Sequence, residues 1–155
     1  MRRRRNALAA AFAALTLVLA GCGKSAGEGL VGVWRVVDER LTTTVTSVPD
    51  GWDLNGSHTE LADYGEDPYP ETWTFSGGGI LTVTPAHGDT GAVSGPYSVD
   101  GGSLLFLRDG DTVRFDMLVP APGAMNLSTR WYEFYTAGKY TVCNTHRRTL
   151  NLEKM

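Results

Sequence analysis

Three histidines and two cysteines are the side chains of this sequence best suited to bind a metal or to act as a base or nucleophile. His58, His87 and His146 lie too far apart to form the H-x-x-x-H or H-E-x-x-H spacing of a helical zinc site. Residues 91–95 read GAVSG, which is not the G-x-S-x-G of a nucleophilic serine, and there is no phosphate-binding G-x-x-x-x-G-K-[ST]. Two cysteines cannot supply a four-thiolate zinc site. We therefore predict a protein that is not an enzyme and has no bound metal or cofactor.

Carboxylates gather between Pro49 and Pro70, a stretch with prolines at positions 49, 68 and 70. Its first part, residues 50–56 (DGWDLNG), is spaced 1, 4, 6 rather than the 1, 3, 5 and 12 of a calcium loop. Because no alternation persists, we predict a long loop with a helical turn near residues 59–64. A loop of this length is functional or mobile, so the acidic 49–70 loop is a candidate partner surface. The alternative is a solvated excursion.

The N-terminal residues form a targeting segment. Four arginines at positions 2–5 precede an uncharged apolar run over residues 7–19. Because a membrane span needs about 20 apolar residues, this run predicts a signal peptide instead. It ends in Leu19-Ala20-Gly21-Cys22, which resembles the lipobox of bacterial lipoprotein precursors. The resemblance implies that residues 1–21 are cleaved and that the Cys22 thiol is diacylated. An ordinary signal peptide with an incidental cysteine is the alternative.

Processing at Cys22 would divide the rest into a polar tether, residues 22–29, and one domain, residues 30–155. Four of the 14 basic residues leave with the signal, so 10 remain against 17 acidic residues, a net charge of −7. An acidic chain does not bind nucleic acid or an anionic membrane through charge. We therefore predict a bacterial cell-envelope protein held by its lipid, in the outer membrane or on the outer face of the cell membrane. Cys143 would be the one remaining thiol, predicted to be buried on a strand.

Period-2 alternation between glycine-containing turns predicts an all-β domain. Residues 112–119 alternate most clearly, and turns are predicted at 77–79, 100–101 and 109–110. Merging bent neighbours leaves eight to ten strands. The strands are predicted over residues 31–39, 41–47, 72–76, 80–85, 95–99, 103–108, 112–119, 127–136, 139–144 and 147–153.

The first predicted strand opens with Leu30-Val31-Gly32-Val33-Trp34, and hairpins of the pattern W-x-F, then G-x-Y-x-V, follow at residues 72–81 and 95–106. This order resembles the lipocalin and lipocalin-like families. The resemblance implies an antiparallel up-and-down β-barrel of about eight strands, with Gly32 and Trp34 as its structural motif and residues 149–153 closing it against the first strand. It also implies an arginine packed over Trp34, for which the candidates are Arg130, Arg147 and Arg148.

The resemblance implies non-enzymatic binding of a small apolar molecule or lipid inside the barrel. Candidate lining residues are Trp73, Phe75, Tyr97 and Phe115. The same aromatic side chains could instead fill the lumen and leave no site. The alternative function is an envelope protein-interaction module, an inhibitor or assembly accessory, that acts through the acidic 49–70 loop. A structural domain without a ligand is the third reading.

Overall fold

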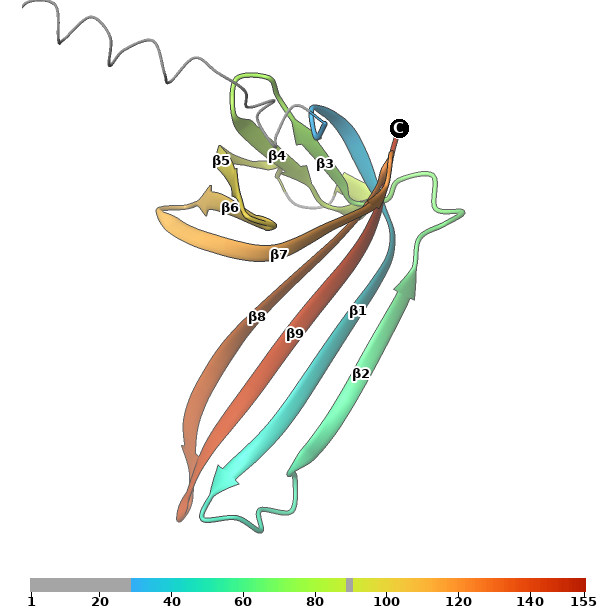
Figure 1. The fold of residues 1–155 in the computed structure, drawn as a ribbon. Coiled ribbons are helices and arrows are strands. Elements are labelled where there is room, and N and C mark those ends of the chain that lie inside the picture. Colours follow the sequence, from blue (N-terminus) through green and yellow to red (C-terminus); the bar gives the residue numbers. More distant parts are fainter. Residues whose placement is uncertain (1–28, 89–90) are drawn as a thin grey trace, which may run out of the picture.

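The computed structural model describes residues 29–88 and 91–155, and these form antiparallel strands with one short 3₁₀-helix (Figure 1). The predicted signal peptide and Cys22 lie outside the described residues. The elements are β1 (Gly32–Val48), β2 (Gly56–Asp63), β3 (Thr72–Phe75), β4 (Ile80–Thr84), η1 (Ala86–Gly88), β5 (Val93–Asp100), β6 (Ser103–Arg108), β7 (Asp111–Ala121), β8 (Ala124–Ala137) and β9 (Tyr140–Lys154).

Eight of these strands close a barrel. From β3 to β9 each strand pairs with the next along the chain, and β9 pairs with β1, whose residues 32–35 pair with β3. This is the up-and-down meander barrel predicted from the sequence, which is confirmed. The predicted turns are also present, and Gly79, Gly101 and Gly110 have φ angles of 78°, 51° and 91°, in the left-handed region that glycine tolerates. Closure pairs the strand edges of the barrel wall.

Apolar side chains fill the interior of the barrel. Trp73 lies edge-to-face against Phe115 with ring centroids 5.2 Å apart, and Phe75 lies edge-to-face against Tyr97 at 5.1 Å. Aliphatic side chains from five strands and Leu30 surround these rings. The buried core consists of Leu30, Trp34, Val36, Trp73, Phe75, Leu81, Leu104, Phe106, Phe115, Met125, Leu127, Leu150 and Leu152.

Strand β1 is longer than the barrel wall and changes partner partway along. After pairing with β3 it meets a bulge between Val36 and Asp38, and residues 38–45 then pair with β2. Backbone hydrogen bonds mark the change: the Val36 amide donates to the Glu71 carbonyl and the Tyr64 amide donates to the Val37 carbonyl. The extra residue of a bulge redirects a strand without ending it. As a result β1 continues beyond the barrel in one piece.

Four strands extend beyond the barrel as an open sheet in the order β2–β1–β9–β8 (Figure 1). We call this part the sheet extension: residues 38–48, 56–63, 129–137 and 140–148. At about 3.3 Å per residue, the segment of β1 in it is roughly 35 Å long. Its inner face continues the barrel interior, and its outer face continues the barrel's outer surface.

The structure corrects two predictions about strands. The 49–70 stretch is not one long loop, because β2 occupies residues 56–63 and pairs with β1. Nearly every side chain of β2 is exposed on both faces, so its sequence lacks the alternation that predicts a strand. The breaks expected near residues 40 and 145 are also absent, because β1 and β9 each run through without interruption.

Candidate binding surface on the sheet extension

The four aromatic residues predicted to line a ligand site lie together in the barrel, but they contact one another. The exposed fractions of Trp73, Phe75 and Phe115 are 2%, 1% and 6%. A lumen large enough for a ligand would leave the side chains around it reachable by water from inside. The packing therefore gives these rings a structural role, and ligand binding by them stays a prediction.

Gly32 and Trp34 lie at the end of the barrel away from the extension. The Trp34 indole nitrogen donates to the Leu30 carbonyl at 2.7 Å. The cation near its ring is Lys154, whose Nζ lies 5.5 Å from the ring centroid. None of the three arginines proposed for this place occupies it, since Arg148 binds carboxylates at the opposite end of the barrel and Arg130 and Arg147 lie on the outer face of the extension.

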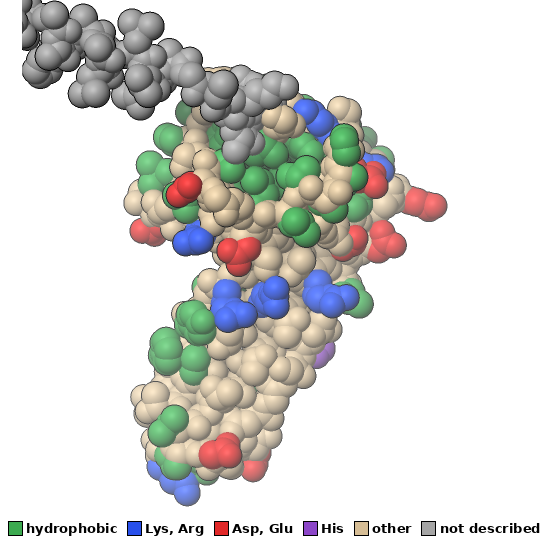
Figure 2. Space-filling model, in the orientation of Figure 1, with side chains coloured by type: hydrophobic (Ala, Val, Ile, Leu, Met, Phe, Trp, Pro, Cys, Tyr) green, Lys and Arg blue, Asp and Glu red, His purple; other side chains and the backbone are tan. Residues whose placement is uncertain are grey.

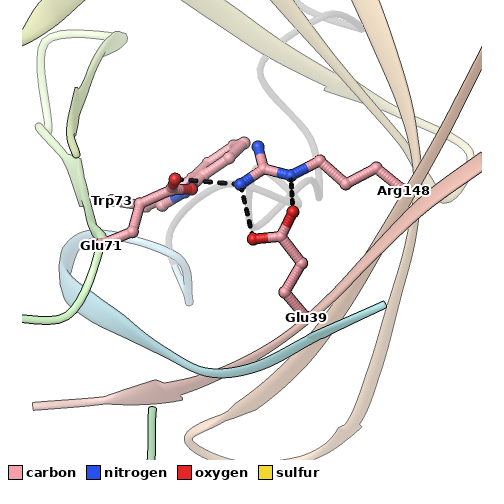
Figure 3. Close-up of polar contacts among 4 residues, drawn as sticks. All are labelled: Glu39, Glu71, Trp73 and Arg148. Atoms are coloured by element: carbon pink, nitrogen blue, oxygen red, sulfur yellow. Dashed lines mark hydrogen bonds and ion pairs between the residues drawn. The ribbon is translucent and has the colours of Figure 1, made fainter. Parts of the chain in front are cut away.

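An ion-pair cluster joins the extension to the barrel (Figure 3). Arg148 on β9 forms two hydrogen bonds to Glu39 on β1, at 2.7 and 3.1 Å, and one to Glu71 at 3.0 Å. Glu71 also accepts a 2.7 Å hydrogen bond from the Trp73 indole nitrogen. The cluster thus connects the point where β1 changes partner to an aromatic ring of the core. We call these residues the junction cluster.

Partial burial makes the junction cluster electrostatically strong. Burial opposes the charge of Arg148, but the hydrogen bonds that Arg148 donates to Glu39 and the charges of Glu71 and Glu39 outweigh it and raise the pKa of Arg148. The pKa of Tyr64 beside the cluster is also raised, first by burial and then by the negative charges of Glu39 and Glu71. The ion pairs of the junction cluster therefore hold the extension and the barrel together.

On the inner face of the extension, three side chains are connected by hydrogen bonds. His146 contacts Glu133 through Nε2 at 3.2 Å and the Thr43 hydroxyl through Nδ1 at 3.0 Å. The Trp131 ring stacks on the imidazole with centroids 5.0 Å apart and planes at 15°. The order carboxylate, imidazole, hydroxyl is that of a catalytic triad.

These three side chains nevertheless lack the surroundings of a hydrolase active site. Thr43 lies in the middle of the sheet, and it pairs with His58 on one side and His146 on the other. The backbone amides around it are therefore used by the two ladders and cannot form an oxyanion hole. The hydrogen-bonded side chains fit a structural role, in which His146 and Trp131 hold β1, β8 and β9 together across the inner face.

The loop of residues 49–55 closes the tip of the extension against its inner face. Trp52 lies edge-to-face against Tyr135 on β8 with centroids 5.9 Å apart. Within the loop, the Asn55 amide nitrogen donates to Asp50 and to Ser47, each at 3.0 Å. Asp50 is thus engaged in holding the loop. No group of three potential metal-ligating side chains occurs among the described residues.

The outer face of the extension carries three exposed arginines close to the barrel. Arg130 and Arg147 lie directly opposite each other on β8 and β9, and Arg40 lies on the neighbouring strand β1. Figure 2 shows basic side chains side by side across this part of the extension. Within the described part of the chain, none of the three forms an ion pair, and Arg147 donates only to the Ser128 hydroxyl. These three residues form what we call the arginine row.

Two aromatic rings continue the outer face toward the tip. Tyr132 and Phe134 follow Arg130 at alternate positions of β8, and their exposed fractions are 55% and 70%. Between β1 and β2 the same face presents paired hydroxyls, with Thr42 bonded to Thr59 and Thr44 bonded to Ser57. The outer face therefore combines positive charge, aromatic rings and hydroxyls on an open sheet.

The remaining predicted residues are dispersed. His87 contacts Asp67 near η1, away from the other two histidines. His58 contacts Glu60 on β2 and lies across Thr43 from His146, so the structure brings two of the three histidines to neighbouring positions of the sheet. Cys143 lies on β9 in the extension and is half-buried rather than buried as predicted. None of the described residues belongs to a helix long and apolar enough to cross a membrane.

The arginine row and the exposed rings beside it were not predicted from the sequence. One signal was present in residues 131–135, which read WYEFY and place large aromatic side chains on both faces of a single strand. A barrel wall with one dry face does not require this. Such a pattern indicates a strand whose two faces both stand outside the barrel core.

Comparison of this chain with known proteins finds no match to a family model, a curated protein or a solved structure.

Proposed function

We propose that this protein is a lipid-anchored, non-enzymatic binding protein of the bacterial cell envelope that uses the sheet extension to hold a macromolecular partner. The observation that carries the proposal is the extension itself, with two open faces and two unpaired strand edges, on β2 and on residues 129–137 of β8. Open edges and contiguous exposed apolar side chains are typical of binding surfaces.

Among the described residues, exposed aromatic side chains concentrate on this part of the molecule. Six large apolar side chains of the extension are between 38% and 74% exposed. We interpret them as contacts for a partner. They are Val48, Leu61, Trp131, Tyr132, Phe134 and Tyr135.

The position of the predicted anchor agrees with this role. The described chain enters the barrel at Leu30, beside Trp34, and β1 then runs from that end of the barrel into the extension (Figure 1). Acylation of Cys22 would place the membrane at the entry end, on a tether of at most about 3.5 Å per residue. The extension would then point away from the anchoring membrane, toward other components of the envelope.

This proposal retains part of an earlier prediction. A partner surface in the 49–70 stretch was the alternative function predicted from the sequence, and β2 and the tip loop in that stretch belong to the extension. Binding of a small apolar molecule in the barrel gains no support from the packed interior.

Photo-crosslinking in the native host tests the proposal. A photoreactive phenylalanine analogue replaces Phe134 on the extension or, as the control, the exposed Ile80 on the barrel. We expect adducts with a macromolecule from position 134 and none from position 80. Absence of adducts at 134, or the same adducts from both positions, would overturn the proposal.

A further inference from the structure

We propose that the outer face of the extension binds an anionic glycan, with the arginine row contacting its phosphate or carboxylate groups and the rings of Tyr132 and Phe134 stacking on its sugars. This inference rests on the proposed function, because it names the chemistry of the partner that the extension holds.

The three charges of the arginine row are not neutralised by an ion pair with any described residue. Nine of the described residues are lysine or arginine. Three of them form ion pairs with carboxylates: Arg35, Arg108 and Arg148. Arg114, Lys139 and Lys154 lie apart from one another and contact a hydroxyl, an aromatic ring or a carbonyl. In the arginine row, by contrast, three positive charges without an ion pair among the described residues lie together on one face, and Arg147 donates only to the Ser128 hydroxyl.

Arginine is suited to this task. Its planar guanidinium binds a phosphate or a carboxylate through two parallel hydrogen bonds. Arg130 and Arg147 lie opposite each other, and like charges in such a pair repel. An anionic group placed between them would remove that repulsion, which makes the pair a natural position for an acidic substituent of the glycan.

The aromatic rings and hydroxyls beside the arginine row lengthen the proposed binding surface. Alternate residues of a strand are about 6.7 Å apart, so Arg130, Tyr132 and Phe134 form a line of regular spacing along β8. Aromatic rings present flat apolar faces to the C–H groups of sugars, and the threonine and serine hydroxyls of β1 and β2 can bond to sugar hydroxyls. An open, flat and elongated face suits an extended polymer.

The same observations argue against the two other classes of macromolecule. A protein interface is usually apolar at its centre and depleted of charge there, whereas this face carries three arginines and a set of hydroxyls beside its aromatic rings. A membrane would have to accept the tip, where the 49–55 loop carries Asp50 and Asp53. Anionic lipids would repel these carboxylates.

Binding of defined polymers to the purified mature chain tests the inference. The probes are alginate as a polyuronate, a phosphorylated mannan, uncharged dextran, polyglutamate as an anionic polypeptide, and phosphatidylglycerol vesicles. The test variant is the double substitution Arg130→Gln and Arg147→Gln, and the control is Arg35→Gln with Arg108→Gln. Both doubles remove two positive charges, so they share the same net charge. The ring contact is tested with Phe134→Ser.

We expect alginate or the phosphorylated mannan to bind and dextran not to bind, and the preferred probe distinguishes carboxylate from phosphate recognition. The test double should weaken binding at least tenfold, the control double less than threefold, and Phe134→Ser at least threefold. Raising the salt concentration should weaken binding further. Circular dichroism should show that all variants remain folded.

Three results would overturn the inference: no binding of either anionic glycan, equal losses in the two doubles, or tighter binding to polyglutamate or the vesicles than to the glycans. If the glycans fail while Phe134 still forms adducts in cells, this inference is refuted and the proposed function stands.

Discussion

Arg130 and Arg147 lie directly opposite each other on β8 and β9, with both side chains exposed and neither in an ion pair with a described residue. Opposed like charges lower the stability of a sheet by roughly 0.2–1 kcal/mol. The pair therefore contributes nothing to folding that a neutral residue would not, and its presence is better explained by a partner that carries negative charge.

The first prediction follows from this pair. Replacing Arg130 by Gln should leave the free energy of unfolding unchanged or raise it by up to about 1 kcal/mol, because it removes a repulsion. Denaturant unfolding of the purified protein measures the difference. A loss of more than about 1 kcal/mol would mean that Arg130 makes a stabilising contact, and it would weaken the case for a binding role.

Arg148 should behave in the opposite way. Arg148→Met would leave Glu39 and Glu71 close together and partly buried without their cation. Breaking a buried ion pair costs about 3 kcal/mol, and the remaining exposure of this cluster places the expected loss at or below that figure. Denaturant unfolding of Arg148→Met and, as the control, Arg147→Met would show it. If the two variants lost the same free energy of unfolding, the ion pairs of the junction cluster would not stabilise the fold as described.

The pH dependence of stability should reflect Tyr64. Burial and the nearby carboxylates raise the pKa of Tyr64, so the folded protein holds the phenol proton more tightly than the unfolded chain, whose tyrosines titrate near pH 10. The resulting stability is fully present below about pH 10 and is lost as pH rises through the folded-state pKa. Tyr64→Phe cannot ionise at this position.

Unfolding free energies at about pH 8 and about pH 11 separate these cases. The wild type should lose more stability than Tyr64→Phe between the two values. If the two proteins lose the same amount, the environment of Tyr64 does not favour the phenol.

Gly95 on β5 should tolerate no side chain. A Cβ at this position would overlap the backbone oxygen of Leu107, so one of the two strands would have to move. We expect Gly95→Ala to lower stability by about 2 kcal/mol. The matched control is Gly91→Ala, since nothing lies within 4 Å of that Cβ. Thermal unfolding of both variants measures the effect, and equal melting temperatures would contradict this packing.

The lipid anchor predicts a change of location. Cys22→Ser removes the thiol that acylation requires, so the protein should be released from membranes or remain unprocessed. Membrane fractionation and the mass of the mature N-terminus report the two outcomes. A variant that stays on membranes and is trimmed normally would show that Cys22 is not the anchor.

The barrel could be predicted from the sequence because its signals are local. The alternation of residues 112–119 and the Asp-Gly pairs at 100–101 and 109–110 each specify a strand or turn within a few residues. The pairing of β9 with β1 followed from the resemblance to the lipocalin families, which required the last strand to close the barrel.

The extension could not be predicted because its signals depend on distant residues. Arg148 and Glu39 are 109 positions apart, and only folding brings them together. The exposed faces of β2 remove the pattern by which strands are recognised. The bulge after Val36 also has no recognisable sequence signal, although it lies where β1 stops pairing with β3 and begins to pair with β2.

The central claim is that the extension, rather than the barrel, is the surface occupied in the cell. The most direct measurement compares thiol labelling in intact host cells with labelling of the purified protein, using Phe134→Cys and Ile80→Cys, each combined with Cys143→Ser. We predict that labelling at position 134 is slowed in cells relative to position 80, because a partner covers the outer face. If the ratio of labelling in cells to labelling of the purified protein were the same at positions 134 and 80, the outer face of the extension would not be covered by a partner.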